Sequence, residues 1–278
     1  MVFLTEEKKQ DAYWNIPIAN TTCILLGTGT SITQAAVRLM SAAGVMLGFC
    51  GGGGTPLIAA NEIEWLSPQS EYRPTEYVQG WLSFWFDEEK RLLAAKHLQL
   101  QRIDFIGRVF NKNKRFLDHG FTAEAIQPSL DIFQEKIALA SETQQLLQAE
   151  AQFTKALYKF AARNTNEAGF KREHRSEDPA NQFLDHGNYL AYGLGATALW
   201  VLGIPHGFAV MHGKTRRGAL VFDAADLIKD AIILPNAFIS VQEAMTEQDF
   251  RKQCLQDFVD HKALVFIFNT LKHLALHP

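Results

Sequence analysis

Three carboxylates and one imidazole are the side chains of this sequence whose spacing most suggests chemistry. Asp223, Asp226 and Asp230 recur at three- and four-residue steps, so they project from a common edge of one helix. Like charges placed in this way repel one another, and a bound cation would remove the repulsion. His212 precedes Asp226 by fourteen positions, behind a glycine-flanked basic turn that can fold the imidazole back over the start of the helix. Carboxylates combined with an imidazole suit Mg²⁺, Mn²⁺ or a similar ion.

The motif by itself does not exclude a simpler interpretation, in which the same residues have only structural roles. Asp223 can serve the dipole of its helix, and His212 can be a loop histidine with satisfied hydrogen bonds. Short motifs of this kind carry a high false-positive risk, and the basic turn can be a solvated surface. The cationic side chains nearby in the sequence are Lys214, Arg216, Arg217 and Lys229.

The helix that carries the aspartates must also present an apolar side to a core. Its apolar residues fall on one stripe at helical spacing. They are Val221, Ala224, Ala225, Ile228 and Ile232. Past Pro235 we expect separate amphipathic helices over residues 237–245 and 247–273, which close the domain.

A second helix, predicted over residues 142–163, carries an acidic residue in apolar surroundings. Glu150 has Leu146 and Leu147 one turn before it, with Phe153 and Leu157 after it. A carboxylate flanked in this way usually needs a partner, although an ordinary helix glutamate remains the alternative on this evidence alone. The same helix carries a basic row at four-residue steps, formed by Lys155, Lys159 and Arg163.

Composition indicates a cytoplasmic protein with two domains. The 278 residues are 47% hydrophobic, enough for one large core or two smaller ones. No apolar run reaches the length that spans a bilayer, and the N-terminus does not resemble a signal peptide, so no membrane association is expected. The net charge of -3 leaves room for a local basic stripe that contacts nucleic acid. We expect reduced core thiols, neither disulfides nor zinc ligands, at Cys23, Cys50 and Cys254.

The order of the patterns predicts an α+β protein, with a small β-rich domain over residues 1–68, a linker at 69–74 and a larger all-α domain over 75–278. The first domain is expected to contain strands at 23–26, 45–50 and near 57–60. Its single helix follows Ser31, which forms a capping-box pattern with Gln34, and ends at Ala42.

Helical patterns fill the second domain. One spans about residues 75–108 and is interrupted by an acidic run at 87–89. Asp178 is a predicted N-cap, and the helix after it runs to Trp200, delivering the chain to the loop that contains His212.

Taken in order, these motifs resemble the CRISPR-associated integrase (Cas-one) family of spacer acquisition. The matching stretches are Leu25–Arg38, Gly51–Leu57, Asp178–Asn181, Val210–Lys214 and Val221–Lys229. Four further stretches look like the I-F subtype of that family, namely Asn15–Asn20, Ser70–Tyr77, Phe84–Lys90 and Phe183–Tyr192.

The resemblance implies a catalytic divalent-metal site and a reaction. The family's glutamate, histidine and aspartate ligands fall on Glu150, His212 and Asp226, with Asp223 as a neighbouring acid. The implied cofactor is Mg²⁺ or Mn²⁺. The implied activity is that of a DNA endonuclease and integrase that inserts new spacer DNA into a CRISPR array for antiviral defence. The residues expected to contact flanking phosphates are Lys214, Arg216, Arg217 and Lys229.

The resemblance also implies partners. These are double-stranded and branched DNA, a second copy of the chain joined through the N-terminal domain, and the small ferredoxin-like adaptation protein that is fused to the interference helicase-nuclease in the I-F subtype. Members of this subtype carry strands before the motif at Trp14, and only thirteen residues precede it here. We therefore expect a shortened N-terminal β-domain and, because that domain joins the two copies in the family, a less stable dimer.

Two other functions fit the same residues. One is a structure-specific DNA repair nuclease that uses the same metal site and only cleaves strands. The other is a non-catalytic DNA-binding scaffold in which the acids stabilise the fold.

Overall fold

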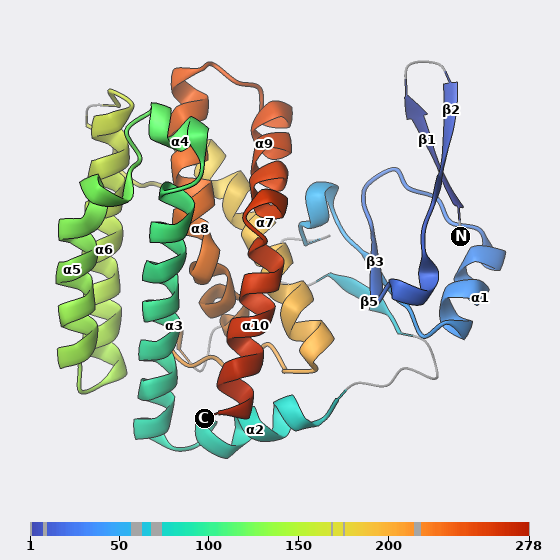
Figure 1. The fold of residues 1–278 in the computed structure, drawn as a ribbon, viewed down its shortest axis with the longest axis horizontal. Helices are drawn as coiled ribbons and strands as arrows, with labels where there is room; N and C mark the ends of the chain where they lie inside the picture. The colour runs from blue at the N-terminus through green and yellow to red at the C-terminus, as the bar shows by residue number, and fades with distance from the viewer. Residues whose placement is uncertain are drawn as a thin grey trace. The chain divides into compact units, whose positions relative to one another are not determined.

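Two units make up the chain, Met1–Arg73 and Pro74–Pro278, and each is described by itself (Figure 1). The computed structural model describes residues 2–7, 10–56, 63–67, 74–167, 169–174, 176–213 and 218–277. Most of the expected linker at 69–74 and the strand expected near 57–60 lie outside these residues.

The first unit contains a hairpin and a three-stranded sheet. Strands β1 (Val2–Glu7) and β2 (Gln10–Asn15) pair antiparallel, with Val2 opposite Asn15. The sheet has the order β3-β4-β5, in which β3 (Cys23–Leu26) and β4 (Met46–Phe49) are parallel and β5 (Glu64–Leu66) is antiparallel to β4. Helix α1 (Gln34–Ala42) forms the crossover that two parallel strands require.

Helix α1 begins two residues later than the capping-box prediction placed it. Thr33, not Ser31, is the N-cap, and its hydroxyl accepts a hydrogen bond from the Ala36 amide at 3.2 Å. Thr33 has the extended backbone that an N-cap needs, directly before the first helical residue. The cap therefore follows local backbone geometry, which the Ser-x-x-Gln pattern alone does not determine.

A small separate core holds this unit together. Its buried members are Met40, Val45 and Leu47. Partly buried side chains of β3 and α1 pack against it. All the side chains of this cluster belong to the first unit.

The second unit is helical throughout its described elements. Its helices are α2 (Glu76–Trp85), α3 (Glu88–Phe110), α4 (Lys114–Asp118), α5 (Ala123–Leu139), α6 (Thr143–Asn164), α7 (Pro179–Leu202), α8 (Ala219–Gln242), α9 (Glu247–Asp260) and α10 (Ala263–Leu276). The structure therefore confirms the predicted fold class, a small β-rich part followed by a larger helical part. Asp178 caps α7 as predicted, with its carboxylate accepting from the Asn181 amide at 2.8 Å.

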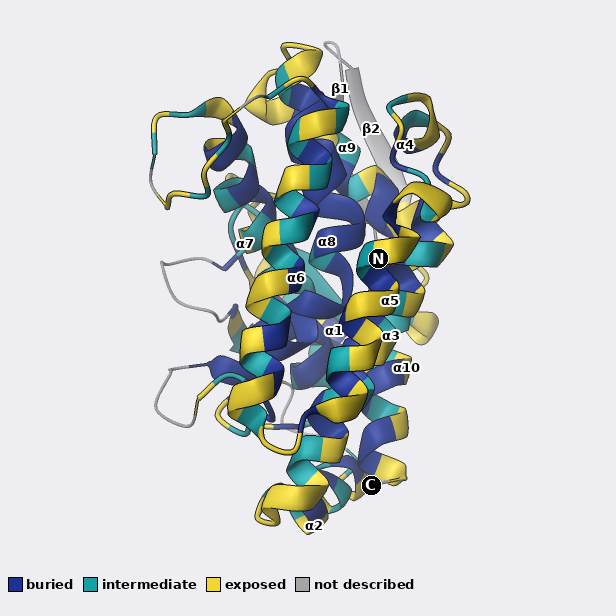
Figure 2. Ribbon diagram, turned by 90° about the vertical axis from the view of Figure 1, so that its left-hand side faces the viewer, coloured by how far each residue is buried: buried dark blue, intermediate teal, exposed yellow. Residues whose placement is uncertain are grey.

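Helix α8 lies at the centre of this unit and is buried on nearly every side (Figure 2). Helices α3, α6, α7, α9 and α10 all contact it. A helix that is apolar around its whole circumference belongs in a core, and α8 is apolar except at a few positions. Any charged residue on α8 therefore needs a partner inside the protein.

Helix α8 continues through Pro235 to Gln242, so the prediction of a separate helix over 237–245 is wrong. A proline inside a helix costs about 3 kcal/mol. Burial of the residues on both sides of Pro235 offsets that cost. Asn236, fully buried, adds side-chain bonds to the Ile232 carbonyl at 3.0 Å and to Asp257 of α9 at 2.7 Å.

The boundaries between α2 and α3 and between α9 and α10 have local causes. The acidic run at 87–89 separates α2 from α3, because the Asp87 carboxylate caps α3 by accepting from the Glu89 and Lys90 amides. The predicted helix over 247–273 is two helices, since Lys262 adopts a left-handed conformation with φ of 53° between α9 and α10. None of the described helices is both long enough and apolar enough to span a membrane.

Candidate functional site

The loop that precedes α8 is held by the helices around it. Gly203 ends α7 in a left-handed conformation with φ of 70°, which glycine adopts without a steric penalty. Two indoles of α2 then fix the loop: Trp81 donates to the Phe208 carbonyl at 3.0 Å, and Trp85 donates to the Ala209 carbonyl at 2.7 Å. The backbone that leads to His212 is therefore tied to α2 at two consecutive carbonyls.

Asp223 holds the end of this loop against α8. Its Oδ2 accepts the amides of Val210 at 2.8 Å and Met211 at 3.1 Å, and its Oδ1 accepts the amide of His212 at 3.1 Å. Oδ1 also lies 2.6 Å from Nδ1 of the His212 ring. Four contacts occupy this buried carboxylate, so Asp223 acts on the site by orienting His212.

The His212 ring is consequently fixed with its other nitrogen toward Asp226. Nε2 lies 4.0 Å from Asp226 Oδ2. Burial lowers the pKa of His212, but the hydrogen bond to Asp223 and the charges of Asp226 and Asp223 outweigh it, so the pKa is raised above its ordinary value. When the ring is neutral with its proton on Nδ1, Nε2 is a free lone pair aimed at the acidic centre.

Asp226 is the carboxylate with the least compensation in this cluster. It is 2% exposed. Among the described residues neither oxygen accepts a hydrogen bond of normal geometry, although Lys229 Nζ lies 2.5 Å from Oδ1 as an ion pair. Burial raises the pKa of Asp226, but the positive charges of Lys229, Arg102 and His212 lower it by more. The pKa of Asp226 is therefore below its usual value. An ionised, buried carboxylate of which only Oδ1 has a cationic neighbour this close fits a cation-binding role.

Glu150 of α6 is connected to the aspartates of α8 by a buried arginine that donates to both Glu150 and Asp230. Arg102 of α3 donates from Nη1 to Glu150 Oε1 at 3.1 Å and from Nε to Asp230 Oδ2 at 2.6 Å. The charges of Asp230, Glu150 and Asp226 all raise the pKa of Arg102 against the effect of burial. The third aspartate of the predicted edge thus has its own counter-ion within the protein, and the conflict among the acids is partly resolved without a metal.

His212 thus faces Asp226, and Glu150 is linked through Arg102 to Asp230 of the same helix, but the three predicted ligands do not form a ready-made coordination shell. Within the described parts of the chain, no three histidine, cysteine or acidic side chains are arranged to hold an ion as they stand. The donor set nevertheless fits a divalent cation chemically, because it contains the Asp226 carboxylate, Nε2 of His212 and a carboxylate at Glu150.

Of the four predicted phosphate-binding residues, the structure describes one. Lys214, Arg216 and Arg217 lie outside the described residues. Lys229 is ion-paired with Asp226, and the charges of Asp226, Asp230 and Glu150 outweigh burial and raise its pKa.

Arg102 is the residue of this cluster that sequence reasoning missed. The signal was present in the pattern of α3, where a charged residue occupies a position of the apolar stripe formed with Leu98, Phe105 and Ile106. A cation at a core position requires an anionic partner, but the spacing does not identify a partner 48 or 128 residues away.

Comparisons with known proteins agree with this arrangement of elements. The family model for the CRISPR associated protein Cas1 matches residues 2–264. The chain is 56% identical to a CRISPR-associated endonuclease Cas1 of Pseudomonas aeruginosa (strain UCBPP-PA14), covering 98% of this chain and 87% of that protein. It is 54% identical to a CRISPR-associated endonuclease Cas1 of Pectobacterium atrosepticum, covering 98% and 86%.

Solved structures share the fold at low sequence identity. The TtCas1–DNA complex superposes with a TM-score of 0.69 at 20% identity, covering 99% of this chain and 93% of that one. A casposase bound to its integration product gives 0.54 at 14% identity, covering 98% and 87%. The matched family model and the two close relatives extend over nearly the whole chain, which therefore belongs to the Cas1 family of CRISPR-associated proteins.

Proposed function

We propose that this chain is a divalent-metal-dependent DNA endonuclease and integrase of CRISPR adaptation, with Glu150, His212 and Asp226 as ligands of Mg²⁺ or Mn²⁺. The observation that carries the proposal is the buried Asp226 carboxylate, which is ion-paired with Lys229 through Oδ1 and has His212 Nε2 facing Oδ2. The relatives named as CRISPR-associated endonucleases support nuclease activity, and the similar fold of the TtCas1–DNA complex supports DNA as the substrate.

The proposed reaction is a transesterification. The 3′-hydroxyl oxygen of a DNA fragment forms a new bond to the phosphorus at the edge of a CRISPR repeat, and the bond from that phosphorus to the repeat's 3′-oxygen breaks. Because one P–O bond forms as another breaks, the number of phosphodiesters is unchanged. The attacking hydroxyl loses a proton and the departing oxygen gains one. With water as the attacking group, the same site is a nuclease.

When bound, the ion supplies charge stabilisation for the phosphoryl group and for the attacking and departing oxygens. The chain's own residues prepare the place for this. Asp223 fixes the tautomer and orientation of His212, and Lys229 balances the charge of Asp226. In this proposal Lys229 and the basic turn of Lys214, Arg216 and Arg217 contact the phosphates beside the scissile bond.

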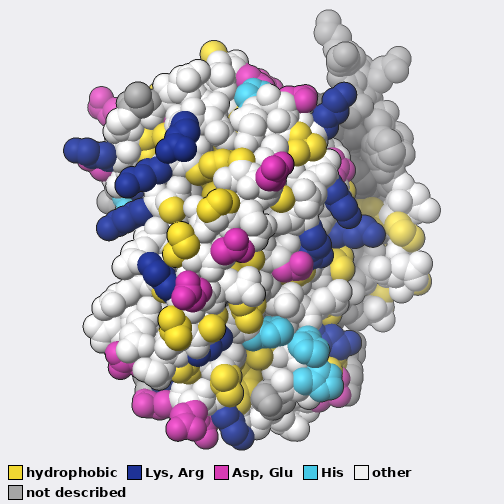
Figure 3. Space-filling model, turned by 60° about the vertical axis from the view of Figure 1, so that its left-hand side comes forward, with side chains coloured by type: hydrophobic (Ala, Val, Ile, Leu, Met, Phe, Trp, Pro, Cys, Tyr) yellow, Lys and Arg dark blue, Asp and Glu magenta, His cyan; other side chains and the backbone are white. Residues whose placement is uncertain are grey.

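A basic surface on α6 supports DNA as the substrate. Lys155, Lys159 and Arg163 are all exposed on the helix that carries Glu150. Figure 3 shows a group of Lys and Arg side chains on the face that includes this helix. Such a row contacts a phosphate backbone without reading its sequence.

The proposal extends to subtype, partners and location. The relatives from Pseudomonas and Pectobacterium, with more than half of the aligned residues identical, are consistent with the I-F subtype. On that basis we propose a homodimer formed through the N-terminal unit and a complex with the small ferredoxin-like adaptation protein that is fused to the interference helicase-nuclease. We place the protein in the cytoplasm, where the array resides.

The test is processing of a branched duplex DNA with Mn²⁺ or Mg²⁺ by the wild type and by Glu150→Ala, His212→Ala and Asp226→Ala. We expect each substitution to lower the rate by at least about 100-fold, because each removes a ligand of the charge-stabilising ion. Glu135→Ala, at an exposed position on α5, is the matched control and should act as the wild type does.

The products distinguish the alternatives. Joined strands support the integrase, whereas cleaved strands alone indicate a repair nuclease with the same site. A wild type that binds DNA but processes none, with or without metal, indicates a scaffold and contradicts the proposal. Circular dichroism of each variant establishes that lost activity is not lost folding.

A further inference from the structure

Arg102 is a buried charge to which the proposed reaction assigns no part. It lies in the middle of α3 and is 1% exposed. Taking a guanidinium out of water costs several kcal/mol unless its partners compensate, and an apolar side chain at this core position would avoid the cost. Its presence at the acidic cluster calls for an explanation in terms of what it does there.

The hydrogen bonds of Arg102 use all five of its donors. Besides the bonds to Asp230 and Glu150, Nη1 donates to Gln99 Oε1 at 3.1 Å, and Nη2 contacts Asp230 and donates to Thr154 Oγ1 at 3.3 Å. A planar guanidinium has five N–H groups in a fixed fork, so its orientation is fully determined here. Asp230 of α8 and Glu150 of α6 are thereby linked through one rigid group.

Only one oxygen of Glu150 takes part in this network. Oε1 accepts from Arg102 and also from the Thr154 hydroxyl, one turn later on α6, at 3.0 Å. None of the hydrogen bonds between described residues uses Oε2. Two donors on one oxygen fix the rotation of the carboxylate and leave the second oxygen for another ligand.

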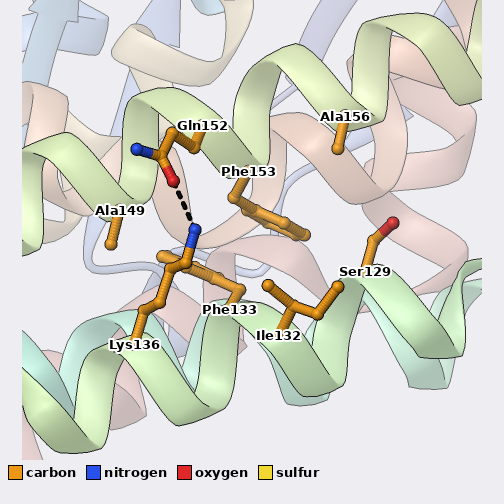
Figure 4. A pocket seen from close by; sticks show the side chains of 8 residues that line it. All are labelled: Ser129, Ile132, Phe133, Lys136, Ala149, Gln152, Phe153 and Ala156. Atoms are coloured by element: carbon orange, nitrogen blue, oxygen red, sulfur yellow. Dashed lines mark hydrogen bonds between the residues drawn. The ribbon is translucent and has the colours of Figure 1, made fainter.

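An aromatic ring also packs against the arginine. The ring of Phe153 lies 5.6 Å from the guanidinium carbon, and it stacks on Phe133 of α5 with ring centroids 4.3 Å apart. Figure 4 shows the two rings facing one another between α5 and α6, at a cavity of about 80 Å³. The cavity itself offers no charged cluster. Phe153, which lines the cavity, is thus also a packing partner of Arg102.

We propose that Arg102, together with Thr154, is a positioning residue that orients Glu150 so that its free oxygen completes the metal site. The inference rests on the proposed function, since it presupposes that Glu150 binds metal. It differs from two other roles for the same arginine. A purely structural ion pair would affect folding alone, and a competing internal cation would weaken metal binding.

The test measures Mn²⁺ affinity of the DNA-free protein, by electron paramagnetic resonance of unbound Mn²⁺, for Thr154→Val and Arg102→Lys. Thr154→Val removes one donor to Glu150 with little change in shape, and Arg102→Lys keeps the charge but loses the fork. We expect both to raise the Kd for Mn²⁺ roughly 10-fold, as loss of supporting hydrogen bonds does at metal sites. Thr154→Ser, which keeps the hydroxyl, should restore an affinity near that of the wild type.

Arg108→Lys is the matched control on the same helix, because its ion pair with Asp104 is exposed and away from Glu150. Its Kd for Mn²⁺ should stay within about twofold of the wild type. If Arg102→Lys does not fold, Thr154→Val decides the question. An unchanged Kd in the folded variants overturns the positioning role, and a lower Kd identifies Arg102 as a competitor of the metal. If the wild type binds no Mn²⁺, the proposed metal site itself fails, and the variants are not needed to establish that.

Discussion

At the scale of single residues, the three aspartates of α8 have three different surroundings despite their common edge. Asp223 accepts backbone amides and the His212 ring, Asp226 faces His212 and Lys229, and Asp230 pairs with Arg102. Spacing placed them together but did not distinguish their tasks. The differences arise from what the loop, α3 and α6 bring to each carboxylate.

Asp223→Asn tests the orienting role of the first aspartate. The new amide would point a donor at amides that are themselves donors, so we expect the free energy of unfolding to fall by about 1–3 kcal/mol. Because His212 would lose its fixed orientation, the Kd for Mn²⁺ should rise by roughly 10- to 100-fold. Urea denaturation and a Mn²⁺ titration measure the two effects, with exposed Asp260→Asn as the control. An unchanged Mn²⁺ affinity would show that His212 needs no support from Asp223.

At the scale of elements, the sequence pattern within one segment predicted helix positions and caps well, whereas contacts between distant segments could not be predicted from it. The Asp178 cap, the helix that carries Glu150 and the apolar stripe of α8 could all be predicted, because each depends on neighbours within one or two turns. The continuation of α8 through Pro235 could not, since burial against other helices outweighs the local preference. The role of Arg102 could not be predicted for the same reason, because its partners are distant in the sequence.

The contact between α3 and α10 predicts a dependence of stability on pH. Figure 3 shows histidine side chains gathered on one part of the surface. The rings of His97 and His273 have centroids 5.7 Å apart. Burial and, secondly, the charge of His273 lower the pKa of His97 below its ordinary value of 6.5.

The unfolded chain therefore binds more protons than the folded protein as the pH falls through about 6.5, and stability decreases on acidification. We expect the Tm of the wild type to drop between pH 7.5 and pH 5.5 by more than the Tm of His97→Gln. His174→Gln, at an exposed histidine outside this contact, is the control. Equal drops in the wild type and His97→Gln would mean that other groups dominate the acid sensitivity.

At the scale of the whole molecule, the proposed ligands and all of their described supports belong to the unit Pro74–Pro278. The first unit has its own sheet and its own small core, with no described side chain among the contacts of Glu150, His212 or Asp226. Assembly, which the family resemblance assigns to the N-terminal unit, and metal binding are therefore expected to be separable.

A fragment of residues 74–278 tests this separation. We expect it to retain a helical circular dichroism spectrum and to bind Mn²⁺ with a Kd within about threefold of the full chain, because a domain with its own core can fold alone. Sedimentation should give a dimer for the full chain and a monomer for the fragment. A fragment that is unfolded, or that is still dimeric, would contradict the division of tasks.

The two indoles bound to consecutive carbonyls of the loop before α8 have a practical consequence. Trp81 and Trp85 are two of only five tryptophans in the chain, and each donates its N–H directly to the segment that leads to His212. Indole fluorescence responds to the loss or gain of such a bond. The protein thus contains an intrinsic optical reporter of its own loop, and the emission spectrum should follow metal or DNA titrations in real time without an added label.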